Sequence, residues 1–166
     1  MIAEAAILFN LAGAPILLSR AVSGTAAYVA TESERNRDQF LNSLVMGKQF
    51  QKSAHELQSV ASECSSANWD GYNAYPVTAD TYDIALQFLK ALPLYSAPTS
   101  VGAEPDGHLT LEWYKSSRWL LSLSIGPDGM LYYAALFGTS KQYGSEPFLG
   151  NVPQPIMNLI NRVATV

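Results

Sequence analysis

The sequence of 166 residues contains a single cysteine and only two histidines. A single cysteine, Cys64, excludes an intramolecular disulfide and is typical of a reducing compartment, so we expect a cytoplasmic protein. The histidines, His55 and His108, fall in different predicted elements, and no residue of a metal-ligand type lies near Cys64. The sequence therefore predicts neither a metal site nor a bound cofactor.

Charged residues are also scarce, at 14% of the chain, and the formal net charge is −4. A nucleic-acid-binding surface needs clustered Lys and Arg, whereas here only Arg35 and Arg37 lie close together. A glycine-rich phosphate loop is also missing, because Gly126 and Gly129 belong to a predicted hairpin. We therefore do not expect nucleic acid as a partner.

The sequence has no uninterrupted apolar run of membrane-spanning length. Residues 2–18 are mostly apolar, but they include Glu4 and Asn10 and are interrupted by Gly13 and Pro15. A spanning helix needs about 20 predominantly apolar residues, and a signal peptide begins with a positively charged region that is missing here. We expect this stretch to pack against the rest of the protein or a partner, and a membrane partner is not expected.

What the sequence does contain divides it into two parts, an N-terminal helical extension over residues 1–65 and an α+β domain over residues 66–166. In the first part, helices are predicted over residues 3–12, 15–30 and 33–63. The third has a narrow apolar stripe and a polar opposite face, and a lone helix of this kind is marginally stable. We therefore expect the N-terminal helices to dock on another protein or on a second copy of the chain.

The second part begins and ends with an amphipathic helix. Thr78 is a suitable N-cap for the first of these helices, and Pro93 closes it. The last helix follows Pro155, and its apolar residues recur at i, i+3, i+4 and i+7, namely Ile156, Leu159, Ile160 and Val163.

Between these helices the pattern alternates, as in β-strands, over residues 108–114, 118–125 and 130–137, and residues 142–148 could add an edge strand. The fold class is therefore α+β: a three- to four-stranded antiparallel meander sheet, packed on one face by two helices, with an N-terminal helical extension. Residues 94–107 are read as a connection rich in Pro, Ser and Gly.

The turns predict how the strands pair. With a three-residue loop over 115–117 and a Gly-Pro-Asp-Gly turn at 126–129, all odd-numbered strand positions lie on one apolar face. The even-numbered face then carries rows of small polar residues, His108–Ser124–Tyr132 and Thr110–Ser122–Ala134. His108 opposite Ser124 is a candidate pair for nucleophilic catalysis, although nothing in the sequence orients the imidazole, and such a pair is also ordinary on a solvent-exposed face.

The segment from Ser66 to Pro76 combines turn-forming residues with large aromatic ones, among them Trp69 and Tyr72. Such a loop often fastens one layer of a fold to another, with its tryptophan buried. Alternatively, Asp70 and Tyr72 form part of a binding surface. We interpret the segment chiefly as a structural clasp.

This segment, together with Asp106-Gly107, Leu111-Glu112-Trp113, residues 124–129 and Glu146-Pro147-Phe148, resembles a family of small, uncharacterised bacterial proteins that share an N-W-D-G-Y-G-A-type motif. The resemblance covers roughly residues 62–163. Asn73 stands where the motif usually has Gly, and Asn is the other residue that best tolerates the left-handed region. The resemblance implies a fold unit and carries no activity.

These observations favour a non-enzymatic protein that binds another protein or regulates it, such as an antitoxin-like protein or an inhibitor or partner of a defence system. The alternative is a small-ligand binder or hydrolase that uses the polar sheet face. No residue is assigned a catalytic role; the candidate binding residues are Trp69, Asp70, Tyr72, His108, Ser122, Ser124 and Tyr132.

Overall fold

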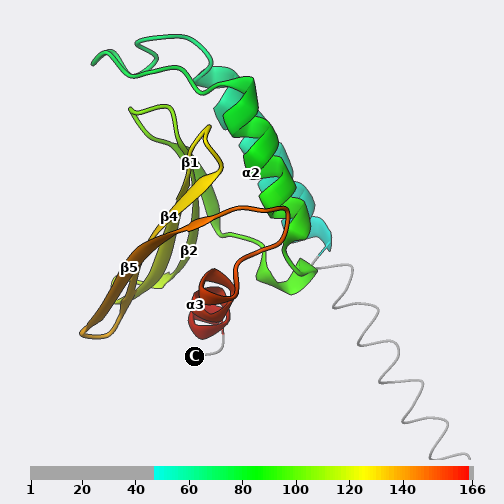
Figure 1. Cartoon of the computed structure of the whole chain (residues 1–166), viewed down its shortest axis with the longest axis vertical. Helices are drawn as coiled ribbons and strands as arrows, with labels where there is room; N and C mark the ends of the chain where they lie inside the picture. The colour runs from blue at the N-terminus through cyan, green and yellow to red at the C-terminus, as the bar shows by residue number, and fades with distance from the viewer. Residues whose placement is uncertain (1–46, 165–166) are drawn as a thin grey trace, which may run out of the picture. The chain divides into compact units, whose positions relative to one another are not determined.

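A computed structural model describes residues 47–164, which belong to one compact unit, Gln39–Val166. The described chain begins in a helix that reaches residue 63. The other elements are α2 (Ala79–Ala91), the 3-10 helix η1 (Leu94–Ser96), β1 (Ser100–Ala103), β2 (Leu109–Ser116), β3 (Trp119–Ile125), β4 (Met130–Phe137), β5 (Ser140–Pro147) and α3 (Gln154–Ala164) (Figure 1).

The two helices predicted in the α+β part form where the sequence indicates. Thr78 is the N-cap of α2, and its side-chain oxygen accepts a hydrogen bond from the backbone N–H of Thr81. Asp80 in the first turn and Lys90 in the last turn both complement the helix dipole. In α3, the four apolar residues at helical spacing are all buried, as predicted.

The sheet is an antiparallel meander in the order β1-β2-β3-β4-β5. The α+β class is confirmed, but the sheet has five strands rather than three or four. The additional strand, β1, lies within the predicted connection over residues 94–107 and pairs with the first half of β2. It has only four residues, including Gly102 and Ala103, which are too small to give a clear alternation.

The predicted pairing of β3 with β4 is confirmed, with Ser124 opposite Tyr132 and Ser122 opposite Ala134. The predicted pairing of β2 with β3 is wrong by two residues, because the chain turns at residues 117–118, with a bulge, instead of through a three-residue loop. Thr110, rather than His108, therefore lies opposite Ser124. A shift of two residues leaves every side chain on its predicted face, because side chains alternate with a period of two.

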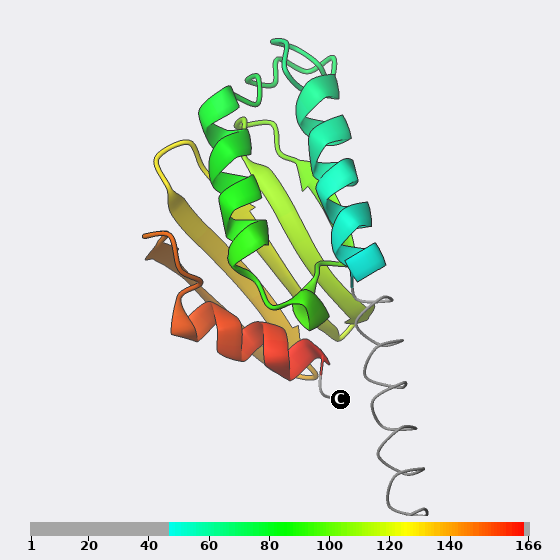
Figure 2. The ribbon, with the colours of Figure 1, turned by 90° about the vertical axis from the view of Figure 1, so that its right-hand side faces the viewer.

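All three long helical segments lie on one side of the sheet (Figure 2). The odd-numbered sheet face supplies most of the core beneath them, and the fully buried residues on it include Leu111, Leu123 and Leu131. The even-numbered face, which we call the open face, is not covered by any element of the described chain, and it exposes Tyr114 and Tyr132. The sheet thus has one packed and one open face.

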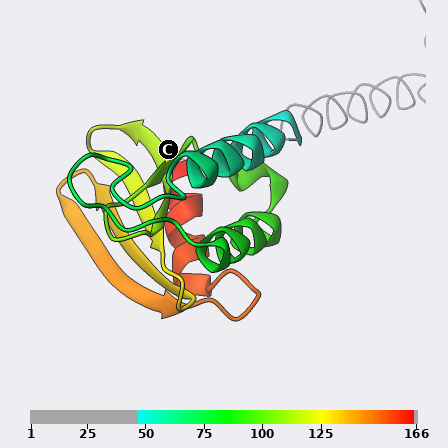
Figure 3. The ribbon, with the colours of Figure 1, turned by 90° about the horizontal axis from the view of Figure 1, so that it is seen from above.

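The described part of the predicted N-terminal extension shares this core. Leu57, in the helix ending at residue 63, is fully buried and belongs to the same apolar cluster as α2 and the sheet. The Ser53 hydroxyl lies 3.2 Å from the Pro98 carbonyl oxygen, and the backbone N–H of Val101 in β1 lies 3.4 Å from a Glu56 carboxylate oxygen. The helix of residues 47–63 lies beside α2, as the view from above shows (Figure 3).

The helices predicted over residues 3–12 and 15–30, and the first part of the one over 33–63, lie outside the described residues, as does the docking role proposed for them. Within residues 47–164, no helix combines the length and the apolar character that crossing a bilayer requires.

Candidate binding site

The loop of residues 68–76, which we call the aromatic loop, is held in shape by its own side chains. The Asp70 carboxylate accepts hydrogen bonds from the backbone N–H groups of Tyr72 (2.7 Å) and Ala74 (3.1 Å). The Asn68 side-chain oxygen accepts one from the Asn73 N–H at 2.8 Å. Asn68 and Asn73 both adopt positive φ, as does Gly71 between them. These contacts fix the backbone of a loop that would otherwise be free to move.

The aromatic side chains of this loop divide into one that packs inward and two that do not. Trp69 packs against the core, and its indole N–H donates to the Tyr75 carbonyl oxygen at 3.0 Å, but the side chain is only half-buried, less than predicted for a clasp. Tyr72 is 88% exposed and Tyr75 is 70% exposed. The loop therefore combines a structural tryptophan with two tyrosines that lie open to solvent.

The aromatic loop rests on the turn between β1 and β2. The Tyr75 backbone N–H donates to the Pro105 carbonyl oxygen at 2.8 Å. Gly107 has a φ of +86°, and a Cβ atom there would lie 2.9 Å from the Pro76 carbonyl oxygen. Only glycine fits this close approach, and the contact brings two segments of the predicted site to the same end of the sheet.

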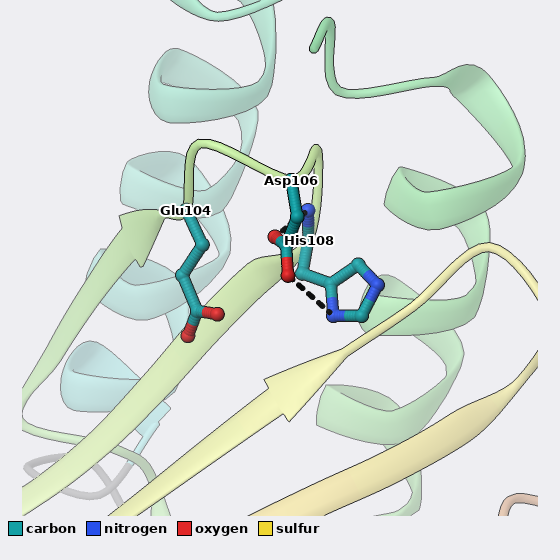
Figure 4. A group of neighbouring side chains, drawn as sticks. All are labelled: Glu104, Asp106 and His108. Carbon is teal, nitrogen blue, oxygen red and sulfur yellow. Dashed lines mark hydrogen bonds and ion pairs between the residues drawn. The ribbon is translucent and has the colours of Figure 1, made fainter. Parts of the chain in front are cut away.

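Next to this turn lies a group of polar side chains on the open face, at the same end (Figure 4). The Ser124 hydroxyl lies 3.1 Å from His108 Nδ1 and donates to Glu104 Oε2 at 3.2 Å. Thr110 donates to the other oxygen of Glu104. The Asp106 carboxylate lies 3.7 Å from His108 Nδ1, and the imidazole stacks on the Tyr132 ring with the centroids 5.8 Å apart.

The structure thus brings together the three residues of the predicted row His108–Ser124–Tyr132, but by a different route. His108 precedes β2 and reaches Ser124 diagonally, since Thr110 occupies the directly opposite position. Ser122 is the remaining candidate on this face, and it lies in β3 two residues before Ser124. It lines a hollow of about 330 Å³ at the edge of the sheet. The aromatic loop, which contains Trp69, Asp70 and Tyr72, meets the β1–β2 turn through the hydrogen bond from the Tyr75 N–H to the Pro105 carbonyl oxygen.

The geometry of this group does not form a nucleophile relay. In a Ser–His–Asp triad, the serine and the carboxylate contact different ring nitrogens, so that the imidazole can pass a proton between them. Here Ser124 and Asp106 both approach Nδ1 of His108. Because Ser124 donates its only hydroxyl proton to Glu104, its contact with His108 requires that Nδ1 carry a proton. In this arrangement the His108 imidazole does not accept the Ser124 proton, which is directed to Glu104 instead.

The same group is the one place in residues 47–164 where three residues of metal-ligand type converge. Glu104, Asp106 and His108 each offer one ligand atom, and these atoms lie within 4.8 Å of one another. Carboxylate oxygen and imidazole nitrogen together suit several divalent cations. Each oxygen of Glu104 already accepts one hydrogen bond, from Thr110 or from Ser124, so a bound cation would share these oxygens with the two hydroxyl groups.

Glu104 and Asp106 are not among the binding residues predicted from the sequence: Asp106 enters only through the resemblance, and Glu104 lies in the predicted connection over residues 94–107. The signal that could have found them is Pro105-Asp106-Gly107, a strong turn signal directly before a strand. A turn there implies a partner strand ending near Ala103, so Glu104 and His108 flank the turn and lie side by side.

No protein-family model matches the sequence, and no match was found among curated proteins or among solved structures.

Proposed function

We propose that this protein binds another protein, and that the aromatic loop and the adjoining polar group form its binding surface. The observation that carries the proposal is the pair of highly exposed tyrosines, Tyr72 and Tyr75, on a loop whose backbone N–H groups donate hydrogen bonds to the side chains of Asp70 and Asn68. Tyrosine is enriched at protein–protein interfaces, where it supplies a large contact area at a low entropic cost. A loop already fixed in shape loses little further entropy on binding.

The polar group extends this surface onto the open face of the sheet. Tyr132 is 43% exposed, and the stacked His108 ring lies beside it. Asp106, at the tip of the β1–β2 turn, is exposed as well. Aromatic residues surrounded by exposed polar groups are the usual composition of a protein-binding patch.

The test is capture of partners from a lysate of the native host by the full-length protein, compared with two variants. Tyr72→Ala combined with Tyr75→Ala removes the proposed anchors and no recorded side-chain hydrogen bond. Tyr143→Ala is the matched control, because this tyrosine is 84% exposed but lies on β5. We expect proteins captured by the wild type and by the control to be lost from the double variant. Equal capture by all three would refute the proposal.

A further inference from the structure

The charged side chains of the described chain are segregated along the direction of the strands. One end of the sheet, which we call the acidic end, carries the aromatic loop, the β1–β2 turn, the β3–β4 turn and the start of α2. The acidic residues there are Glu63, Asp70, Asp80, Asp83, Glu104, Asp106, Asp128 and Glu146. Within residues 47–164, Lys and Arg are absent from this end.

The opposite end, which we call the basic end, carries the β2–β3 and β4–β5 turns, the end of α2 and the end of α3. All Lys and Arg residues of the described chain lie towards it: Lys48, Lys52, Lys90, Lys115, Arg118, Lys141 and Arg162. Only two carboxylates of residues 47–164, Glu56 and Glu112, lie between the two ends.

Hydrogen bonds and ring contacts place these segments together independently of the strand order. At the acidic end, the backbone N–H of Phe148 donates to Gly129, and that of Tyr75 donates to Pro105. At the basic end, the N–H of Gly138 donates to the Arg118 carbonyl, which joins the two turns. The Arg162 guanidinium lies 4.1 Å from the centroid of the Phe137 ring, at the end of β4.

The two sets of charges do not neutralise each other within one molecule. Within residues 47–164, no Lys or Arg pairs with a carboxylate, and all seven basic side chains are exposed. The eight-residue strands separate the two ends by about 23 Å at 3.3 Å per residue. This distance exceeds the Debye length of about 8 Å at physiological ionic strength, so each end presents its own field to the solvent.

We infer that the acidic end of one molecule binds the basic end of a second copy, head to tail. The inference rests on the proposed function, because it gives the aromatic loop a specific partner. The two ends are complementary in charge, and both occur on every copy. They also match in chemistry: Tyr72 and Tyr75 offer exposed ring faces, and Lys115 and Arg118 are exposed cations that can lie over them.

This contact is heterologous, since it joins different surfaces of the two copies. Unless the rotation between copies closes a ring, such a contact builds open chains whose length grows with concentration. Because it depends on exposed charges, the association weakens as salt is added. Residues 1–46 contain acidic and basic residues in nearly equal number, so they leave the charge difference between the two ends nearly unchanged.

The test is sedimentation velocity on the full-length protein over a range of concentrations, at about 20 mM and about 500 mM salt, where the Debye lengths differ roughly fivefold. Two variants each remove about half of the formal charge of one end: Glu63→Lys with Asp83→Lys at the acidic end, and Lys115→Glu with Arg118→Glu at the basic end. None of these four side chains makes a recorded hydrogen bond, and all four are exposed. We expect the wild type to sediment faster with rising concentration at low salt and as a monomer at high salt.

Each variant alone should associate much less than the wild type at low salt, because one of its two ends has lost about half of its charge. An equimolar mixture of the two should associate more than either variant alone, because the unaltered acidic end of one variant can bind the unaltered basic end of the other. A wild type that is monomeric at every concentration at low salt would overturn the inference, and so would association that is insensitive to salt or to both variants. If the tyrosine variants nevertheless lose captured partners, the proposed function stands while the second copy is excluded as the partner.

Discussion

At the scale of single residues, the aromatic loop depends on backbone conformations that few side chains tolerate. Asn73 has a φ of +69° and Asn68 a φ of +62°. The Asn68 side chain accepts a hydrogen bond from the Asn73 N–H, whereas the Asn73 side chain has no recorded partner. Asn73 therefore contributes to the loop mainly because Asn tolerates a positive φ.

Two substitutions at Asn73 test this reading. Asn73→Ala should lower the free energy of unfolding by about 1–2 kcal/mol, because a Cβ without a local hydrogen-bonding group disfavours the left-handed region. Asn73→Gly should leave it within about 0.5 kcal/mol, since Gly adopts this φ without a steric penalty. Urea denaturation measures both values. An alanine variant as stable as the glycine variant would show that the loop adopts another conformation.

Cys64 is a buried thiol in the apolar core, directly after the helix of residues 47–63. Burial, and to a lesser extent the neighbouring Glu63 carboxylate, raises the pKa of the Cys64 thiol. Because only the thiolate reacts with alkylating agents, a raised pKa lowers the reactive fraction near neutral pH.

We therefore expect iodoacetamide to modify Cys64 slowly in the folded protein. We also expect the rate to keep rising with pH after an ordinary cysteine would already be fully ionised. The same chain in denaturing urea provides the control, where the thiol is exposed and its pKa is ordinary. Equal rates in the two conditions would mean that Cys64 is accessible in the folded state.

At the scale of elements, the helix of residues 47–63 contributes to the core and also protects an edge of the sheet. The Glu56 carboxylate accepts a hydrogen bond from the Val101 N–H, on the outer edge of the short strand β1. An unpaired strand edge can recruit other strands, and this contact reduces that exposure. The helix therefore does more than extend the domain.

Leu57→Ala tests how firmly this helix is packed. Leu57 is fully buried, so its truncation should cost about 2–5 kcal/mol of unfolding free energy. Gln58→Ala, at the exposed neighbouring position, should change it by no more than about 0.5 kcal/mol. Chemical denaturation of both variants provides the comparison. If the two costs are the same, the helix does not share the core.

The elements also show what the sequence could and could not predict. The pairing of β3 with β4 was predictable because Gly126, Asp128 and Gly129 specify one turn geometry, and Gly129 does have a positive φ. The turn after β2 contains neither glycine nor asparagine, so the sequence does not specify the length of this loop. The predicted pairing of β2 with β3 is therefore wrong by two residues. Each residue still occupies its predicted face, because the two-residue turn is accompanied by a bulge between Tyr114 and Ser116, and together they shift the pairing by an even number of residues.

For the site, the sequence indicated His108, Ser124 and Tyr132 through alternation alone. It did not indicate Glu104, because the four residues of β1 are too few to show a pattern. The sequence also predicts a more deeply buried Trp69, because residue propensities do not show that backbone N–H groups of the loop donate hydrogen bonds to the side chains of Asp70 and Asn68. Contacts between segments that are distant in the sequence could not be predicted from the sequence.

At the scale of the whole molecule, the charge arrangement is invisible in the composition. A net charge of −4 and scattered basic residues suggest a weakly acidic, featureless surface. The meander topology changes this, because it brings alternate turns to the same end of the sheet. Lys115 and Lys141 lie far apart in the sequence, yet both lie in strands next to turns at the basic end, whereas Asp106 and Asp128 belong to turns at the other end. Folding converts a mixed sequence into two separated surfaces.

Residues 47–164 consequently carry a permanent electric dipole directed along the strands. In the field of a charged surface, the dipole favours one approach over the other, independently of the net charge. A cationic surface would bind the acidic end, which carries Tyr72 and Tyr75, and would leave Lys115 and Arg118 facing the solvent. An anionic surface would bind the basic end and leave the tyrosines facing the solvent. The same domain would then expose different residues to the solvent, depending on the charge of the surface that binds it.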